Sequence, residues 1–451
     1  MNLKFIFAIS LFQSVLLIAQ SIPRDHFLYQ SRKLLYDAGK DWKSLTIFGP
    51  IRFKPGPKKK SNTFKSLNYF DGQIGFDAGN NNSYSLYGSG YFKYNDYYYG
   101  YLYPVIKNKK NHQFGIKTNF TSNQGGQSGI GYENSWVILQ IGRGKESWGS
   151  GNDIELALSE TSSTYDYFLL ASDYGKIRVK YVYGFLESVQ SDINRYITAR
   201  GFEWTNKRSL IIGFSETVIY SGENRSIDIA YLNPMSSHLE IELNNRLNII
   251  GDGNSNAVWQ FHVDYLIKKN FRFSLNYLYD EFVFDPDIQI GKEHGKAYSV
   301  KLAYTPLFSK KHLITLYCSL VHVGTPTFRH GNGNNNFVQS GRPLGWSRGS
   351  DAQETSFGIN YFDNKNLIVK ISTGLLHSGE ETISNRIFDP YSDYLKGPFP
   401  SGEIEKTHYI DTNLIYWFKQ NYSISSFVYW SQDIKAIDLK LNVPIFRSFG
   451  D

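Results

Sequence analysis

The sequence has very little cysteine and methionine, and it has no apolar run long enough for a transmembrane helix. Its 451 residues include one cysteine, Cys318, and two methionines. A lone cysteine can form neither an intramolecular disulfide nor a cysteine-based zinc site. No stretch approaches the ~20 unbroken apolar residues that a membrane-spanning helix needs. These absences exclude a disulfide-stapled fold and a bundle of transmembrane helices.

The longest apolar run lies at the N-terminus and is typical of a secretory signal peptide. Lys4 supplies positive charge, and residues 5–19 supply an apolar core that is short for a membrane span. Polar residues follow at Gln20 and Ser21, so residues 1–20 are assigned to the signal peptide. No cysteine lies near this point, so no lipoprotein anchor is expected. We therefore expect an exported chain.

Aromatic residues and glycine are abundant instead. Tyrosine (34), phenylalanine (32) and glycine (39) are frequent, and aromatic residues make up 16% of the chain. This composition favours many strands joined by Gly/Asn turns. The formal charge of +7 is modest, and nucleic acid is not an expected partner of an exported chain. Lysine-rich stretches at 58–60 and 107–110 suit either solvated turns or the phosphates of outer-membrane lipid.

Residues 25–39 form the one helix that the sequence predicts clearly. Asp25 can cap its start and Gly39 can end it. Four apolar residues share one face at helical spacing: Phe27, Leu28, Leu34 and Leu35. The helix lies in a periplasmic segment assigned to residues 21–66. It is expected either to plug or brace the main fold, or to lie on its surface.

From about residue 68 onward, apolar and polar residues alternate with period two. In residues 257–265 the odd positions are apolar or aromatic, whereas the even positions include Gln260, His262 and Asp264. Such alternation gives each strand one apolar and one polar face. The same pattern recurs in residues 177–183, 271–279, 298–304 and 437–443.

The polar face of these strands distinguishes a membrane barrel from a soluble sandwich. The strands run for roughly 9–13 residues, near the length that crosses a bilayer. Aromatic residues cluster at strand ends, and the polar face carries full charges that a wet lumen accommodates better than a dry core. We therefore predict an all-β, transmembrane antiparallel β-barrel of about 18 strands over residues 67–451. Its predicted lumen-facing residues are Arg178, Lys180, His262, Asp264, Asp280 and Lys301.

The connections between the predicted strands are short on one side and long on the other. With the N-terminal side periplasmic, the inner turns are short, at 172–175, 205–207, 268–270, 362–365 and 419–421. Every long connection then lies outside: 143–164, 221–256, 283–294, 324–353 and 378–406. This asymmetry is typical of outer-membrane barrels. We therefore expect a monomer in the outer membrane of a Gram-negative bacterium.

Two motifs resemble catalytic or metal sites but lack the context that such chemistry needs. Residues 345–349 match the G-x-S-x-G of a hydrolase nucleophile elbow, yet they lie in a Gly/Asn-rich loop with no helical pattern behind them. Asp285, Asp287 and Glu293 do not have the spacing of an EF-hand. We therefore predict no enzyme activity, no metal and no cofactor.

The long outer connections carry side chains suited to carbohydrate. Trp148 stands among small residues that leave its ring open to stack on a sugar, unless the ring packs inside the fold. Connection 324–353 combines arginine and amide side chains with aromatic rings, although exposed loops are polar in most proteins. The candidate sugar-binding residues of these loops are Arg143, Glu146, Trp148, Arg329, His330, Arg342, Trp346 and Arg348.

Short motifs follow one another along the chain in a distinctive order: Gly142-Arg143, Trp148-Gly149-Ser150-Gly151, Leu156-Ala157-Leu158-Ser159, Gly213-Phe214-Ser215-Glu216, Tyr231-Leu232-Asn233-Pro234, Asn244-Asn245, Tyr279-Asp280-Glu281, Gly341-Arg342-Pro343-Leu344-Gly345 and Gly349-Ser350-Asp351. This order resembles the capsule-assembly family of Wzi-type outer-membrane proteins, over residues 135–355. The chain departs from the family at Ser150, where proline is usual, and in its short N-terminal helical region.

The resemblance implies an eighteen-stranded outer-membrane barrel with a helical periplasmic element. It also implies lectin-like binding of capsular or exopolysaccharide, which adds Asn233 to the candidate site and polysaccharide export machinery to the expected partners. The residues leave one alternative open, a general or sugar-selective porin, because lumen-facing charges also line channels.

Overall fold

The computed structural model describes residues 27–40, 72–79, 83–94, 97–107, 126–188, 192–246, 255–280, 290–291, 293–309, 311–331, 333–383, 396–419, 422–432 and 435–446. The predicted signal peptide lies outside these residues. So do Asp285 and Asp287 of the acidic motif and most of the predicted periplasmic segment.

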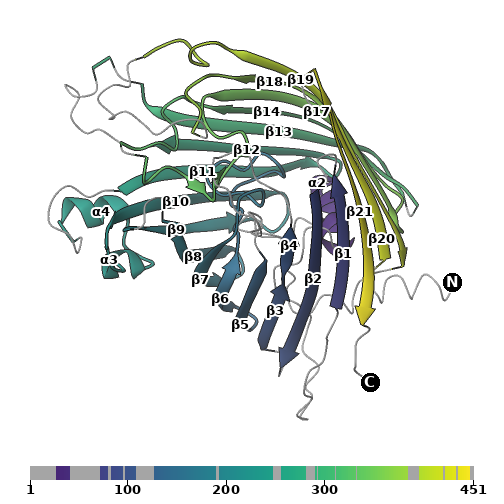
Figure 1. The fold of residues 1–451 in the computed structure, drawn as a ribbon, viewed down its shortest axis with the longest axis horizontal. Helices are drawn as coiled ribbons and strands as arrows, with labels where there is room; N and C mark the ends of the chain where they lie inside the picture. The colour runs from purple at the N-terminus through teal and green to yellow at the C-terminus, as the bar shows by residue number, and fades with distance from the viewer. Residues whose placement is uncertain are drawn as a thin grey trace.

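One antiparallel sheet of 19 strands dominates the structure and curves round on itself (Figure 1). Its first strands are β1 (Gly72–Gly79), β2 (Ser83–Tyr94), β3 (Tyr98–Tyr103), β4 (Val105–Lys107), β5 (Gln127–Glu133), β6 (Val137–Gly144), β7 (Tyr165–Asp173), β8 (Ile177–Leu186), β9 (Ile193–Thr205) and β10 (Leu210–Glu223). The remainder are β11 (Ser255–Lys268), β12 (Phe271–Asp280), β13 (Gly295–Phe308), β14 (Leu313–Val323), β17 (Ala352–Phe362), β18 (Leu367–Ser378), β19 (Glu405–Lys419), β20 (Tyr422–Ser431) and β21 (Lys435–Phe446). A separate hairpin consists of β15 (Val338–Gln339) and β16 (Arg342–Pro343). The predicted all-β, antiparallel fold is confirmed.

The strands follow one another round the sheet in the order of the chain, and the first strand also pairs with the last. β1 lies between β2 and β21, with Phe76 opposite both Leu86 and Leu441. β3 and β4 both pair with β2 and are separated by Pro104. Proline has no backbone N–H to donate to a ladder, so it divides what is otherwise one strand.

Alternation separates an apolar outer face from a polar inner face, as the period-two pattern predicts. Phe261 of β11 stands opposite Tyr277 of β12, and the two side chains are 41% and 43% exposed. In the next row, His262, Asn276 and Ser299 are aligned across β11, β12 and β13 and are fully buried. Because neighbouring residues of a strand point to opposite faces, β11 and β12 direct Phe261 and Tyr277 outward and His262 and Asn276 inward.

Short turns close one end of the sheet, and long loops leave the other end, in agreement with the predicted asymmetry. Side chains hold the short turns: Asn206 and Asp363 each accept three backbone N–H bonds through one carbonyl or carboxylate oxygen. Long connections join β6 to β7, β10 to β11, β12 to β13, β14 to β17 and β18 to β19. Two short helices lie at the long-loop end (Figure 1): α3 (Ile229–Leu232) and α4 (His238–Leu243).

The helix predicted near residues 25–39 is α2 (Phe27–Asp37), and it lies inside the curve of the sheet (Figure 1). It ends as predicted, because Gly39 adopts a left-handed conformation (φ 69°). Leu34 packs against inner-face residues of β14, β17, β18 and β19, and the charged Lys33 and Asp37 are buried as well. The helix is therefore not a surface element. In the described part of the chain, no helix is long and apolar enough to cross a membrane.

Candidate functional site

Two long loops fold into the interior and form a single core, which we call the inner plug: residues 145–164 and 324–351. Backbone bonds join the two loops, from Ser159 N to Leu344 O (2.8 Å) and from Trp346 N to Leu156 O (3.1 Å). Leu156 and Leu344 are completely buried at this contact. The plug occupies the interior at the long-loop end of the sheet.

The close approach of these loops explains the G-x-S-x-G motif. A Cβ atom on Gly345 would overlap the carbonyl oxygen of Leu156, so only glycine fits where the loops cross. Ser347 is exposed, and no helix follows it. The motif thus serves loop packing and lacks the strand–turn–helix context of a nucleophile elbow.

Amide side chains of the sheet hold the plug against the inner wall. Asn276 accepts a bond from Ser150 N (2.7 Å) and donates one to Ser150 O (2.8 Å). Ser299 donates to Ile154 O at 2.7 Å. A proline at position 150 would have no N–H to donate to Asn276, so serine at this position allows a backbone bond to the wall.

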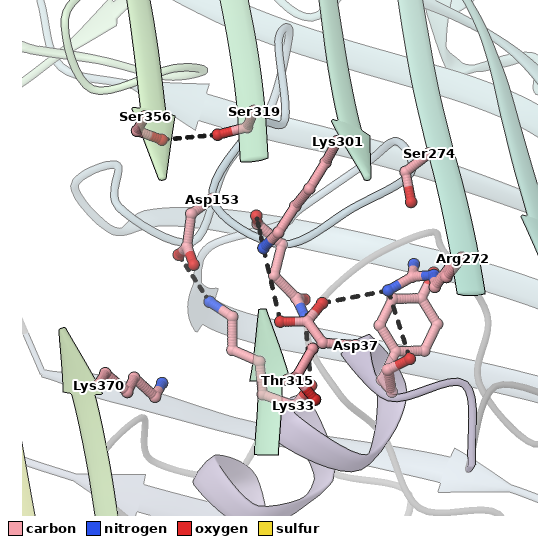
Figure 2. Close-up of polar contacts among 12 residues, drawn as sticks. Lys33, Asp37, Asp153, Arg272, Ser274, Lys301, Thr315, Ser319, Ser356 and Lys370 are labelled. Atoms are coloured by element: carbon pink, nitrogen blue, oxygen red, sulfur yellow. Dashed lines mark hydrogen bonds and ion pairs between the residues drawn. The ribbon is translucent and has the colours of Figure 1, made fainter. Parts of the chain in front are cut away.

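Ion pairs connect α2 to the plug and to the wall (Figure 2). Lys33 donates to Asp153 (2.8 Å) and Glu160 (2.5 Å) of the plug. Asp37 lies 3.1 Å from Arg272 of β12 and 3.5 Å from Lys301 of β13. Breaking one partner of such a buried set leaves an uncompensated charge, so the set fixes the position of α2. We call these contacts the α2 network.

All six residues predicted to face the lumen are buried on the inner face: Arg178, Lys180, His262, Asp264, Asp280 and Lys301. The sequence suggests that these side chains face water in a lumen, but in the structure they contact other protein groups. Lys180 pairs with Glu146 of the plug, and Asp280 accepts a bond from the Phe328 N–H of the plug. The carboxylate of Asp264 accepts from the Arg272 guanidinium at 2.7 Å. Protein atoms therefore cover this part of the wall.

Four of the nine candidate sugar-binding residues are buried within the plug: Glu146, Trp148, Arg329 and Trp346. Trp148 is 0% exposed and Trp346 is 5% exposed, so neither indole presents an open ring face to a sugar. Arg329 pairs with Glu381 at 3.0 Å. These side chains hold the plug together, and they are left out of the candidate site.

The remaining five candidates are separated by the fold. Arg143 lies near the end of β6 and pairs with the exposed Asp166 (2.8 Å). Asn233 is exposed at the end of α3, on the outside of the sheet. His330 and Arg342 are half-buried on the plug, and burial lowers the pKa of both side chains. Arg348 differs from these four. It lies against the inner wall at β17 and β19, where several side chains are partly exposed.

Aromatic and charged residues lie near Arg348 or next to Tyr429 on the inner face of β20, and we call them the Arg348 cluster: Arg348, Glu354, Tyr409, Asp411, Phe427 and Tyr429. Arg348 Nε lies 3.5 Å from Glu354 Oε2, and its guanidinium lies 5.9 Å from the Tyr409 ring centroid. The Tyr409 hydroxyl donates to Glu354 at 2.5 Å. Tyr409 and Tyr429 are stacked, with centroids 5.6 Å apart and planes 20° apart. The cluster thus combines donors, acceptors and ring faces.

This cluster lies near the long-loop ends of β17, β19 and β20, on the inner face. Its neighbours on β20, Ser423 and Ser431, are buried on that face, whereas Phe427 is 36% exposed. The Arg348 side chain is 35% exposed and that of Glu354 is 15% exposed. Asp411 is half-buried and accepts a bond from Ser372. The plug therefore leaves this part of the wall accessible.

The electrostatics of the cluster keep Arg348 positively charged. Burial lowers the pKa of its guanidinium, but Glu354 and the hydroxyls of Tyr429 and Tyr409 outweigh burial, and the net shift of the pKa is upward. Among the residues that the structure describes, no group of three or more His, Cys, Asp or Glu side chains is placed to hold a metal ion. The arrangement suits recognition by hydrogen bonds and ring stacking.

Sequence reasoning identified Arg348 and missed its partners. Glu354 and Tyr409 are 55 residues apart, and strand register brings them together with Tyr429. The alternation pattern could have pointed to them. Glu354, Tyr409 and Tyr429 all occupy inner-face positions close to strand ends on the long-loop side.

These features define a β-barrel of the outer-membrane class whose interior is occupied by its own loops and helix. The sequence matches no protein-family model and no curated protein. Among solved structures, the fold is similar to that of Wzi, described as an outer-membrane protein involved in group 1 capsule assembly in Escherichia coli and a carbohydrate-binding β-barrel. The two chains align with a TM-score of 0.61 and 13% identity over 85% of each chain. The resemblance to Wzi-type proteins is therefore confirmed at the level of the fold.

Looser likenesses extend to two further proteins. Pseudomonas aeruginosa OprD aligns with a TM-score of 0.41 and 11% identity, over 85% of this chain and 97% of that one. Pseudomonas aeruginosa OccD3 (OpdP) aligns with a TM-score of 0.46 and 10% identity, over 88% and 95%. TM-scores below 0.5 are too low to bear on function. The fold shared with Wzi is that of an outer-membrane β-barrel, in agreement with the outer-membrane location expected from the sequence.

Proposed function

We propose that the chain forms a closed transmembrane barrel of eighteen crossings in the outer membrane. The count takes β3 and β4 as one crossing interrupted by Pro104, so 19 strands give 18 crossings. Pairing of β1 with β21 supports closure. The even number, the short turns and the long loops agree with single-chain outer-membrane barrels, whose long loops face the cell exterior.

We further propose that this barrel binds capsular or exopolysaccharide through the Arg348 cluster and helps to attach it to the cell surface. The observation that carries the proposal is an accessible aromatic and charged surface on an inner wall that the plug and α2 cover at β11–β13. Wzi is a carbohydrate-binding β-barrel, and its similarity in fold supports the same function here. Export machinery remains a proposed partner.

The side chains of the cluster have separate roles in this proposal. Phe427 and Tyr429 offer ring faces to the apolar face of a sugar. Glu354 and Asp411 accept bonds from hydroxyl groups, and Arg348 donates to hydroxyls or grips a carboxylate with two N–H groups. A glycan that carries uronic acid or pyruvate would gain most from Arg348.

A matched pair of variants on β20 tests the proposal. Tyr429→Ala removes a ring from the inner face, whereas Trp430→Ala removes a 58% exposed ring from the outer face of the same strand. Loss of one stacking contact is worth on the order of 1 kcal/mol, so Tyr429→Ala should weaken polysaccharide binding several-fold. Trp430→Ala should leave binding unchanged. Binding is measured with purified protein and the organism's own polysaccharide.

Arg348 provides a second test with its own control. Arg348→Ala should weaken binding of an acidic polysaccharide about tenfold, equivalent to ~1.4 kcal/mol. Arg348→Lys keeps the charge but loses the two-pronged geometry, so it should recover only part of the affinity. Equal binding by wild type, Tyr429→Ala and Arg348→Ala would rule out the cluster as the glycan site.

A second candidate function, a sugar-selective porin, is favoured by the same exposed wall at β19 and β20. An accessible inner wall is what a narrow channel would need, whereas the inner plug and α2 oppose one. Conductance across planar bilayers separates the two functions. Steady single-channel current from the wild-type protein would favour the porin; its absence, together with glycan binding, would favour the lectin.

A further inference from the structure

The loop between β10 and β11 folds back over the outside of the sheet. We call residues 224–246 of this loop, which include α3 and α4, the outer shelf. The Tyr231 ring stacks on Tyr220 of β10, with centroids 4.5 Å apart and planes 17° apart. Tyr181 of β8 donates to Tyr231 O at 2.7 Å. Both strand tyrosines lie on the face that carries the exposed Phe185 and Phe214. The shelf is therefore an external element (Figure 1).

The shelf covers charges that the membrane would otherwise meet. Arg200 of β9 and Glu216 of β10 are directly opposite on the outer face and form a 3.3 Å ion pair. Glu216 also accepts bonds from the His238 N–H of the shelf (3.0 Å) and from Trp259 Nε1 (3.0 Å). The side chains of the pair are only 11% and 3% exposed. Because lipid-facing charges are costly in a barrel, the shelf shields a pair that lipid would destabilise.

An apolar band meets the edge of the shelf. Phe202, Phe214 and Phe261 are aligned across β9, β10 and β11, and they are 50%, 40% and 41% exposed. This row lies two residues from the Arg200–Glu216 row, about 7 Å along the strands. The surface that faces lipid thus continues directly up to the shelf.

The shelf carries its own exposed apolar side chains. Ile229 is 79% exposed, Met235 is 88% exposed and Leu243 is 70% exposed, with Leu232 at 40%. Soluble surfaces seldom gather large exposed apolar residues in so short a segment. The shelf also carries the ion pair of Glu240 and Arg246 (2.5 Å), so it is amphipathic, as elements at a membrane interface are.

We propose that the outer shelf rests in the outer leaflet of the outer membrane, with Ile229, Met235 and Leu243 inserted at the boundary between headgroups and acyl chains. The occupant of this surface is lipid, because the surface is continuous with the lipid-facing phenylalanine row. The shelf thereby sets the height of the barrel in the bilayer and keeps the Arg200–Glu216 pair away from acyl chains. This role is separate from glycan binding.

Single-cysteine labelling tests the proposal on the full chain. Cysteine replaces Ile229, Met235 or, as a control, the exposed Ser347 of the plug, each in a Cys318→Ala background. Each cysteine carries an environment-sensitive fluorophore, and the protein is reconstituted in phosphatidylethanolamine–phosphatidylglycerol vesicles. Bromine on the lipid acyl chains should quench the labels at positions 229 and 235, and aqueous iodide should not. The label at position 347 should show the reverse.

Two results would overturn the proposal. Iodide quenching at positions 229 and 235 equal to that at 347, without quenching by brominated lipid, would place the shelf in water. Protection from iodide that rises with protein density, still without quenching by brominated lipid, would instead identify a second copy of the chain as the occupant. Heat-modifiable migration of each labelled variant on gels confirms that the barrel is folded.

Discussion

The inner wall differs between β11–β13 and β19–β20, although both regions have the same period-two pattern. On β11–β13, His262, Asn276 and Ser299 are fully buried under the plug and α2. On β20, Phe427 is 36% exposed and Tyr429 is only half-buried. The strand pattern therefore specifies a polar inner wall, and the loops determine which part of that wall a ligand can reach.

The charges of the two regions differ in the same way. Arg272 of the covered wall is 3% exposed and pairs with both Asp264 and Asp37. Arg348 at the exposed wall is 35% exposed and has a single carboxylate at 3.5 Å. A buried pair that loses one partner is strongly destabilised, whereas a partly exposed pair contributes little. The covered wall thus stabilises the fold, and the exposed wall retains side chains for a ligand.

The largest expected effect comes from breaking the covered wall. Arg272→Ala leaves the carboxylates of Asp264 and Asp37 buried without this cation, which should cost about 3–5 kcal/mol of stability. The urea concentration that abolishes heat-modifiable migration should fall sharply. Arg348→Ala, the matched change at the exposed wall, should cost about 1 kcal/mol or less. Similar losses in the two variants would remove the distinction between the walls.

A smaller effect is expected where the two plug loops cross. In Gly345→Ala, the new methyl group overlaps the Leu156 carbonyl oxygen and forces the loops apart. Overpacking of this kind typically costs about 1–3 kcal/mol. Proteolysis of the loops should become faster in folded protein. Ser347→Ala, two residues away at an exposed position, serves as the control, and equal proteolysis of both variants would contradict the packing role of Gly345.

Accessibility can be compared directly with two serine-to-cysteine changes in a Cys318→Ala background. Ser299 lies on the covered wall and is 0% exposed, whereas Ser425 lies on the exposed wall and is half-buried. A water-soluble thiol reagent should label Ser425→Cys and leave Ser299→Cys unlabelled. The double variant Gly345→Ala with Ser299→Cys should gain labelling if the plug is what covers the wall. Rapid labelling of Ser299→Cys alone would show that the plug is open.

The smallest expected effect is on the pH dependence of the plug. Burial lowers the pKa of His330, so the folded state binds its proton less readily than the unfolded chain, whose histidines titrate near ~6.5. The folded state is therefore not penalised by His330 above that pH, where the side chain is neutral in both states. It loses stability as the pH falls below that value, because the unfolded chain binds the proton more readily. Proteolysis of the plug should increase modestly between pH 7.5 and pH 5. His330→Asn should reduce the increase, and an unchanged profile would exclude His330 as a cause.

His238 of the outer shelf contributes in the same direction, because burial, Arg200 and His330 lower its pKa to about 3. His238 is expected to be one source of the pH dependence that persists in His330→Asn. The variant His238→Asn, measured in parallel, separates the two contributions.

The fold was largely predictable because its signals are local. Alternation along 257–265 and 271–279 places the aromatic residues outward, and the turns at Asn206 and Asp363 depend on bonds within four residues. The end of α2 follows from the conformation of Gly39. Each of these signals acts over a few residues, so a single sequence contains it.

The site was only partly predictable because its contacts are distant in sequence. The carbonyl of Trp148 accepts a bond from Gln260, 112 residues away, and Trp346 bonds to Leu156. Gly and Asn content identifies both loops but does not state whether they point outward or inward. The inward fold buries both tryptophans, and the exposed rings belong instead to Phe427 and Tyr429 on a strand.

The position of α2 constrains the order in which the molecule assembles. Its partners lie far downstream: Lys33 meets Asp153 after 120 residues, Tyr36 meets Asp264 after 228, and Gln30 meets Lys370 after 340. β1 likewise pairs with β21 near the end of the chain. Segments near the N-terminus therefore reach their final contacts only when strands far downstream are in place. A chain that ends before β21 lacks the pairing of β1 with β21, so it cannot complete the sheet.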